Sequence, residues 1–148
     1  MARGGVLTFL LMLALMVAGT QRAAAKSKPR VQRVYIFGFS ASFTDSLACI
    51  TPVQQLDSAW VDPSHGMLMD RALYSLQLQY HVESAYGVSN NTCAVFFAKS
   101  QRKAERQWNK LRRRYSKDQN VKFRELNASD FSFKAENYEE NAPVEVNE

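Results

Sequence analysis

Runs of apolar residues divide the chain into strand-like segments. Residues 34–39 and 92–98 are continuous apolar runs of strand length, which is typical of strands covered on both faces. Residues 47–53 form a third run, and because Pro52 cannot donate a backbone hydrogen bond we expect this strand to lie at an edge or to end there. Residues 40–46, between the first and third runs, have the composition of a turn.

Two longer segments have helical spacing. The turn-forming residues 62–66 open a predicted helix that reaches about Tyr86, with Gly87 in a C-cap position. A second helix is predicted over residues 101–117, with Ser100 as its N-cap. At 100° per residue its apolar positions fall within about 60° of one another and form one narrow seam. The residues of the seam are Ala104, Trp108, Leu111 and Tyr115.

Two short alternating segments complete the predicted domain. Residues 120–124 alternate apolar and basic side chains as a half-buried strand would, and residues 131–133 predict a short final strand. The order strand, strand, helix, strand, helix, strand predicts an α+β domain. We expect a two-layer sandwich, in which a mixed four- to five-stranded sheet carries both helices on one face if the two crossovers are right-handed.

The two ends of the chain are predicted to lie outside this domain. Arg3, the apolar residues 6–18 and the small residues 23–25 have the pattern of a signal peptide cut near residue 25, with an uncleaved anchor as the alternative. The single domain would then span residues 26–134. Residues 135–148 are acidic and predict a disordered tail. Cleavage would leave an exported protein, periplasmic or extracellular, without a transmembrane anchor.

The composition agrees with one small globular domain. The 148 residues are 46% apolar and 22% charged, and their formal charge is +5. Two large domains are excluded, and two cysteines are too few for a scaffold built on disulfides. Cys49 and Cys93 leave two alternatives open: a disulfide formed in an oxidising compartment, or two buried thiols of raised pKa.

Patterns for catalysis or cofactor binding are weak. Residues 38–42 follow a strand as a nucleophile elbow would, but Ser42 stands where that motif requires glycine. His65 and His81 are the only histidines and lack metal-ligand spacing. We therefore predict no cofactor, no metal site and no catalytic residue. The alternative is a small exported hydrolase that uses the turn from Ser40 to Asp45 together with His65.

One basic block rises above this background. Between Lys99 and Arg124 there are eleven lysines and arginines against Glu105 and Asp118, a local net charge of +9. In a cytosolic protein such a block would indicate nucleic acid, which we do not expect as a partner after export. The available anions are lipid headgroups, acidic glycans and acidic protein surfaces. The candidate anion-binding residues are Lys103, Arg106, Lys110, Arg112, Arg113 and Arg114.

Two other interpretations of the charges stay open. The basic block is also explained as a solvated helix face that keeps the protein soluble. The acidic tail could fold back over the block as a counter-charge and mask an anion site. The tail contributes a charge of −5 from Glu136, Glu139, Glu140, Glu145 and Glu148.

The layout as a whole resembles small exported proteins of unknown function from Bacteroidetes-type gut bacteria. The similarity covers most of residues 31–134 and rests on the signal peptide, the basic helix and residues 34–38, 42–46, 55–60 and 92–97. It implies a periplasmic or envelope location and carries over no catalytic residue. The sequence thus predicts an exported, non-enzymatic interaction domain whose basic helix contacts an anionic envelope component or a partner protein.

Overall fold

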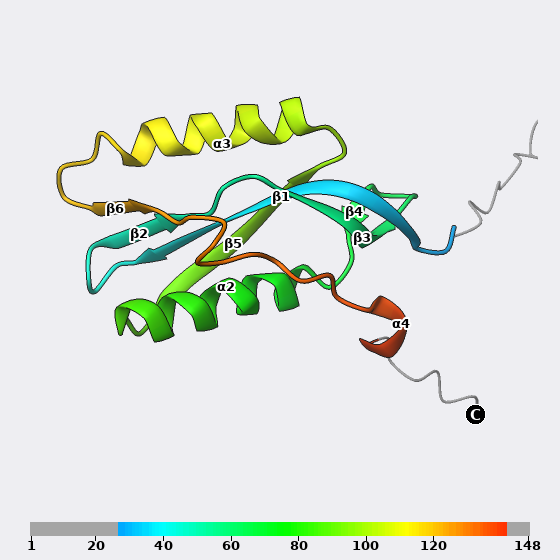
Figure 1. The fold of residues 1–148 in the computed structure, drawn as a ribbon, viewed down its shortest axis with the longest axis horizontal. Coiled ribbons are helices and arrows are strands. Elements are labelled where there is room, and N and C mark those ends of the chain that lie inside the picture. The colour runs from blue at the N-terminus through cyan, green and yellow to red at the C-terminus, as the bar shows by residue number, and fades with distance from the viewer. Residues whose placement is uncertain (1–26, 142–148) are drawn as a thin grey trace, which may run out of the picture.

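The computed structural model describes residues 27–141, and one long strand forms the centre of the domain (Figure 1). This strand, β1 (Arg30–Ser42), includes residues 40–42, which the sequence analysis assigned to a turn. Three strands pair with it in antiparallel fashion: β5 (Asn91–Ala98) on one edge, and β2 (Leu47–Ile50) and β3 (Gln54–Asp62). The sheet is therefore built outward from β1.

A short break separates β2 from β3 along β1. Residues 51–53 leave the ladder there, as the proline at position 52 requires. The Thr51 N–H donates to the Gly38 carbonyl at 2.9 Å, and the Gly38 N–H donates to Thr51 Oγ1 at 2.9 Å. The threonine side chain thus replaces a backbone acceptor, and the two strands follow one line across the break.

Two short strands complete a mixed six-stranded sheet. β4 (Met67–Leu68) pairs antiparallel with β3, and β6 (Lys122–Glu125) pairs parallel with β2. The predicted α+β class with a mixed sheet is confirmed, with six strands in place of four to five. Because β4 occupies residues 67–68, the first helix begins at Arg71 rather than near residues 62–66.

The two long helices lie on opposite faces of the sheet (Figure 1). α2 (Arg71–Tyr86) packs against one face and α3 (Gln101–Tyr115) against the other, so the expectation of both helices on one face is wrong. The chain passes through α2 from β3 across β1 to β5, and returns through α3 in the reverse direction to β6. Two crossovers of the same hand that run in opposite directions place their helices on opposite faces.

Alternation along β1 supplies both cores. Val34 and Ile36 point toward α2 and pack with Leu78, whereas Phe37 and Phe39 point toward α3. All of these side chains are buried. The continuous apolar run that predicted a strand covered on both faces is thereby explained.

The segment after β6 packs on the α2 face without forming a strand. Phe131 and Phe133 are buried as their alternation predicted, but the predicted final strand is absent from this segment. Two glutamine side chains bind its backbone instead. Gln54 accepts from the Phe133 N–H at 2.8 Å and donates to the Phe131 carbonyl at 3.2 Å. Gln77 accepts from the Lys134 N–H and donates to the Lys134 carbonyl, both at 2.9 Å.

The ends of the described chain are placed as follows. The predicted signal peptide, residues 1–25, lies outside the described residues, as do residues 142–148 of the predicted tail. The part of the tail that is described reaches α4 (Tyr138–Asn141), which contacts the domain through Trp60 and Tyr138, with ring centroids 6.1 Å apart. Among residues 27–141 no helix is both long enough and apolar enough to cross a membrane.

Candidate anion-binding face of helix α3

The N-cap of α3 was predicted correctly. Ser100 has an extended backbone, and its Oγ accepts a hydrogen bond from the Lys103 N–H at 3.3 Å. The helix ends at Tyr115, two residues earlier than expected. Three arginines, at positions 112 to 114, occupy its last turn, where positive charge interacts favourably with the helix dipole.

The apolar seam determines which side of α3 meets the sheet. Ala104 is buried, and the Trp108 Nε1–H donates to the Thr51 carbonyl at 2.7 Å. The rings of Tyr115 and Phe39 pack with their centroids 4.5 Å apart. Because contacts at the start, middle and end of the seam all face the sheet, the charged side chains of the helix point to solvent.

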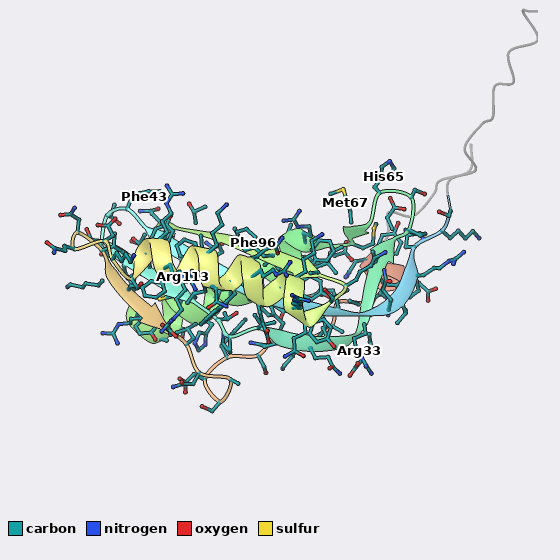
Figure 2. The ribbon with its side chains drawn as sticks, turned by 90° about the horizontal axis from the view of Figure 1, so that it is seen from above. Arg33, Phe43, His65, Met67, Phe96 and Arg113 are labelled. Carbon is teal, nitrogen blue, oxygen red and sulfur yellow. The ribbon has the colours of Figure 1, made fainter. Side chains whose placement is uncertain are left out.

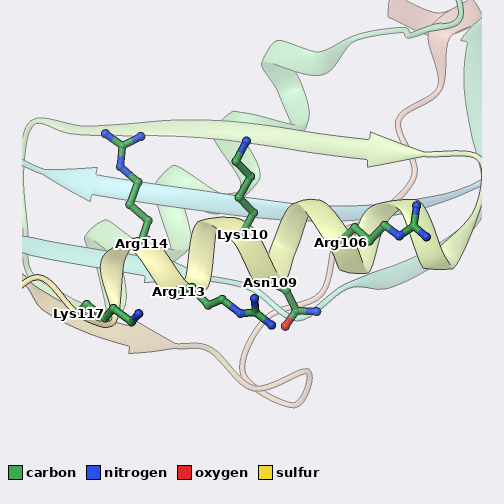
Figure 3. Close-up of a pocket in the computed structure, with 6 residues that line it drawn as sticks. All are labelled: Arg106, Asn109, Lys110, Arg113, Arg114 and Lys117. Carbon is green, nitrogen blue, oxygen red and sulfur yellow. The ribbon is translucent and has the colours of Figure 1, made fainter.

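Four of these charged side chains, together with Lys117 just after the helix, gather around one shallow depression. Its volume is about 620 Å³, and Figure 3 shows the side chains extending from the outer surface of α3. We call this surface the basic face of α3. The residues that line it are Arg106, Asn109, Lys110, Arg113, Arg114 and Lys117.

The cations of the basic face lack acidic partners within the described part of the chain. The ion pairs found among residues 27–141 join Arg33 to Asp57, His65 to Asp62, and Arg112 to Glu125. None involves a residue of the basic face. Five positive side chains therefore share one solvent-facing surface without forming an ion pair among the described residues.

The structure brings together four of the six predicted anion-binding residues. Arg106, Lys110, Arg113 and Arg114 line the depression, and the other two lie elsewhere. Arg112 donates from Nε to Glu125 Oε1 at 2.5 Å, and its guanidinium lies 5.4 Å from the centre of the Trp108 ring. It therefore joins α3 to β6.

Lys103 lines a different hollow near the start of α3, together with Gly66 and Phe97. Two residues of the basic face, Asn109 and Lys117, were missed by the sequence analysis. Lys117 follows Arg113 and Arg114 at the spacing of one helical turn, and this spacing could have identified it.

A second hollow lies between α3 and β5. Its volume is about 220 Å³, and its lining combines apolar and basic side chains. Lys110 and Arg114 belong to both hollows, and Figure 3 shows them reaching from α3 across β5. We call it the β5 groove; it is lined by Phe96, Gln107, Lys110, Leu111 and Arg114.

The two cysteines do not form the disulfide considered above. Ser40 of β1 is paired with Cys49 of β2 on one side and with Cys93 of β5 on the other. The cysteines are thus two strand spacings apart, about 10 Å, beyond the roughly 7 Å between Cα atoms that a disulfide spans. Both are free thiols.

Burial makes both thiols poor nucleophiles. It raises the pKa of Cys49 to about 11, an effect to which Cys93 adds and which Arg124 opposes. Burial also raises the pKa of Cys93, although a hydrogen bond with Ser40 acts in the opposite direction. The raised thiol pKa predicted from the apolar surroundings is confirmed.

The residues of the alternative hydrolase do not meet. Ser40 and Ser42 are buried in β1, and Ser42 Oγ donates to Asp45 Oδ2 at 2.8 Å within the β1–β2 turn. His65 lies in the turn after β3, and the two turns are at opposite ends of the sheet, as Phe43 and His65 show in Figure 2. A strand of the length of β1 separates them by about 40 Å.

His65 has a local partner instead. Its Nδ1 lies 2.6 Å from Asp62 Oδ2, and this hydrogen bond is the main cause that lowers the pKa of Asp62 below its usual range. His81 lies in α2 and packs its ring against Phe131. Within residues 27–141 no three histidine, cysteine or acidic side chains are grouped as metal ligands would be.

The described acidic residues of the tail lie away from the basic face. The Glu136 N–H donates to the hydroxyl of Tyr74 at 3.0 Å, and the Glu136 carboxylate accepts from Gln77; both partners belong to α2. α4, with Glu139 and Glu140, follows on the same side of the sheet (Figure 1). Glu145 and Glu148 lie outside the described residues. The described part of the tail therefore does not cover α3.

Comparisons of the chain with protein-family models, with curated proteins and with solved structures found no match.

Proposed function

We propose that this protein is an exported, non-enzymatic interaction domain that binds an anionic partner through the basic face of α3. The observation that carries the proposal is the grouping of five cationic side chains, four on one face of α3 and Lys117 just after its end, without acidic partners among the described residues. Such a group raises the local concentration of anions and speeds their association.

The attachment of α3 to the sheet supports this role. The hydrogen bond of Trp108 to Thr51 and the ring contact of Tyr115 with Phe39 hold the helix in one rotation. The cations are therefore presented on a rigid element. Since salt screens charges beyond about 8 to 10 Å, the partner must approach this face closely.

The packing of α3 also argues against binding by insertion into a membrane. Its apolar seam is used against the sheet, so no apolar stripe of α3 is left to insert into a membrane. The proposed partner is an anionic envelope component or an acidic protein surface that docks on the charges. Nucleic acid is not the proposed partner, because the signal-like pattern of residues 1–25 supports export.

Heparin chromatography tests the proposal with two variants of equal net charge. One carries R106Q, R113Q and K117Q on the basic face. The other carries K28Q, R30Q and K134Q, which are exposed and lie outside this face. We expect the basic-face variant to elute at clearly lower NaCl concentration than the control variant, because clustered charges act together. Equal elution of the two variants would show that only net charge matters, and the proposal would fail.

A further inference from the structure

The outer edge of β5 is open within the described part of the chain. Of the described strands, only β1 pairs with β5. β5 has eight residues, Asn91–Ala98, and contains neither a charged residue nor a proline. Natural proteins usually protect such edges with charges, prolines, bulges or a covering segment. The strand itself supplies neither of the first two protections, and Arg71 of α2 covers its edge only at the Val95 carbonyl.

The backbone of this edge can accept and donate hydrogen bonds outward. The carbonyl of Val95 accepts from Arg71 Nη2 of α2 at 2.8 Å, so the backbone polar groups of Val95 point away from β1. Because the direction alternates along a strand, Cys93 and Phe97 present their backbone groups to the same side. The side chains of Thr92 and Ala94 are exposed. An incoming strand would thus find outward N–H and carbonyl groups at Cys93 and Phe97, and it would displace Arg71 from the carbonyl of Val95.

Cations flank this edge on both faces of the sheet. On the α3 face, the β5 groove has an apolar floor of Phe96 and Leu111 and a rim that includes Lys110 and Arg114. On the α2 face, the guanidinium of Arg71 lies 5.9 Å from the centre of the Phe97 ring. A strand added at this edge would therefore place its side chains on apolar surface between positive charges.

From this arrangement we infer that β5 binds an extended segment of a partner protein, with alternating aliphatic and acidic side chains, as an additional strand of the sheet. The inference rests on the proposed function and specifies the anionic partner of the same face. Backbone hydrogen bonds supply the pairing, and alternate side chains of the added strand point to opposite faces of the sheet. The carboxylates would lie on the α3 face beside Lys110 and Arg114, and the aliphatic side chains on the α2 face beside Phe97.

A second copy of this chain fits the edge less well. Antiparallel pairing of two β5 strands around a twofold axis would place both α3 helices on the same face of a continuous sheet. Lys110 and Arg114 of the two copies would then face each other across the junction. Like charges brought together in this way oppose self-association, and an acidic strand removes that repulsion.

Peptide binding to the purified protein tests the inference. The probe is a fluorescein-labelled octapeptide of alternating valine and glutamate, followed by fluorescence anisotropy. Its control is the fully N-methylated peptide, which keeps every carboxylate but has no backbone N–H. We expect the control to bind at least about tenfold more weakly, because it cannot donate to the ladder. We also expect slower amide hydrogen exchange at Cys93, Val95 and Phe97 with the unmethylated peptide.

Two matched variants locate the site. Ala94→Glu places a carboxylate on the exposed edge, and Ser58→Glu places one on an exposed position of β3. Only Ala94→Glu should weaken peptide binding, by about tenfold or more.

Equal binding of both peptides would overturn strand addition but leave the proposed function intact. Equal elution of the basic-face variant and its control from heparin would remove the proposed function as well. A dimer of the free protein that Ala94→Glu dissociates would assign the edge to a second copy instead.

Discussion

Gly38 of β1 lies directly against Leu78 of α2. A Cβ at position 38 would come within 2.6 Å of Leu78 Cδ2 and 2.9 Å of Phe133 Cζ. Gly38→Ala should therefore lower the free energy of unfolding by about 1 to 3 kcal/mol through overpacking, which urea denaturation measures. The double variant with Leu78→Ala should lose less free energy of unfolding than the sum of the losses of the two single variants. Strict additivity would show that the Leu78 contact is not the cause.

Gln54 and Gln77 hold the C-terminal segment through side-chain hydrogen bonds. Gln54→Ala or Gln77→Ala should each lower the free energy of unfolding by about 1 to 2 kcal/mol, because backbone groups lose their partners. Hydrogen exchange should accelerate at the Phe133 amide in the first variant and at the Lys134 amide in the second. Gln79→Ala is the control, because Gln79 lies on α2 with Gln77 but forms no hydrogen bond with this segment. It should leave the exchange rates of both amides unchanged. Acceleration in the control would indicate general loosening of α2.

Trp108 anchors the basic face to the break between β2 and β3. Trp108→Phe keeps an aromatic ring but removes the donor to the Thr51 carbonyl. We expect a loss of about 1 to 2 kcal/mol in the free energy of unfolding, since the carbonyl of a buried residue loses its partner. Heparin affinity should fall only slightly, because the cations remain. A loss of heparin affinity as large as that of the basic-face variant would mean that Trp108 itself contacts the anion.

Cys49 should make the free energy of unfolding depend on pH in the alkaline range. Its pKa rises from 9.0 to about 11 because burial favours the neutral thiol in the folded state. The stabilisation is complete below about pH 9, where the unfolded chain also keeps the proton, and is lost as the pH approaches 11. In reducing buffer the free energy of unfolding should decline over this interval, by an amount on the order of 2 kcal/mol for this thiol. Cys49→Ala should flatten that part of the profile, and an unchanged slope would contradict the assignment.

The helix α3 was accessible to sequence analysis because its signals are local. Ser100 as N-cap and the seam from Ala104 to Tyr115 depend only on neighbours within a few turns. The grouping of Arg106, Lys110 and Arg113 follows from the same helical periodicity. These features appear in the structure where the spacing places them.

Features that depend on distant contacts could not be found in this way. β3 was missed because its outward positions are polar and because a register irregularity opposite Gln32 and Val34 breaks its alternation. The ion pair between Arg112 and Glu125 depends on the position of β6 beside α3. The β5 groove depends on how α3 crosses β5. The failure of the cysteines to meet depends on the strand that lies between them.

The parallel pairing of β6 with β2 has a consequence for the order of assembly. Leu47 and Lys122 are partners although β3, both long helices and β5 lie between them in the chain. The antiparallel pairs of β1 with β2 and β3 close much shorter loops, so they can form first at a smaller entropic cost. β6 can join only after α3 has crossed the sheet. We therefore expect the central antiparallel strands to pair before β6 is added and the charged helix docks.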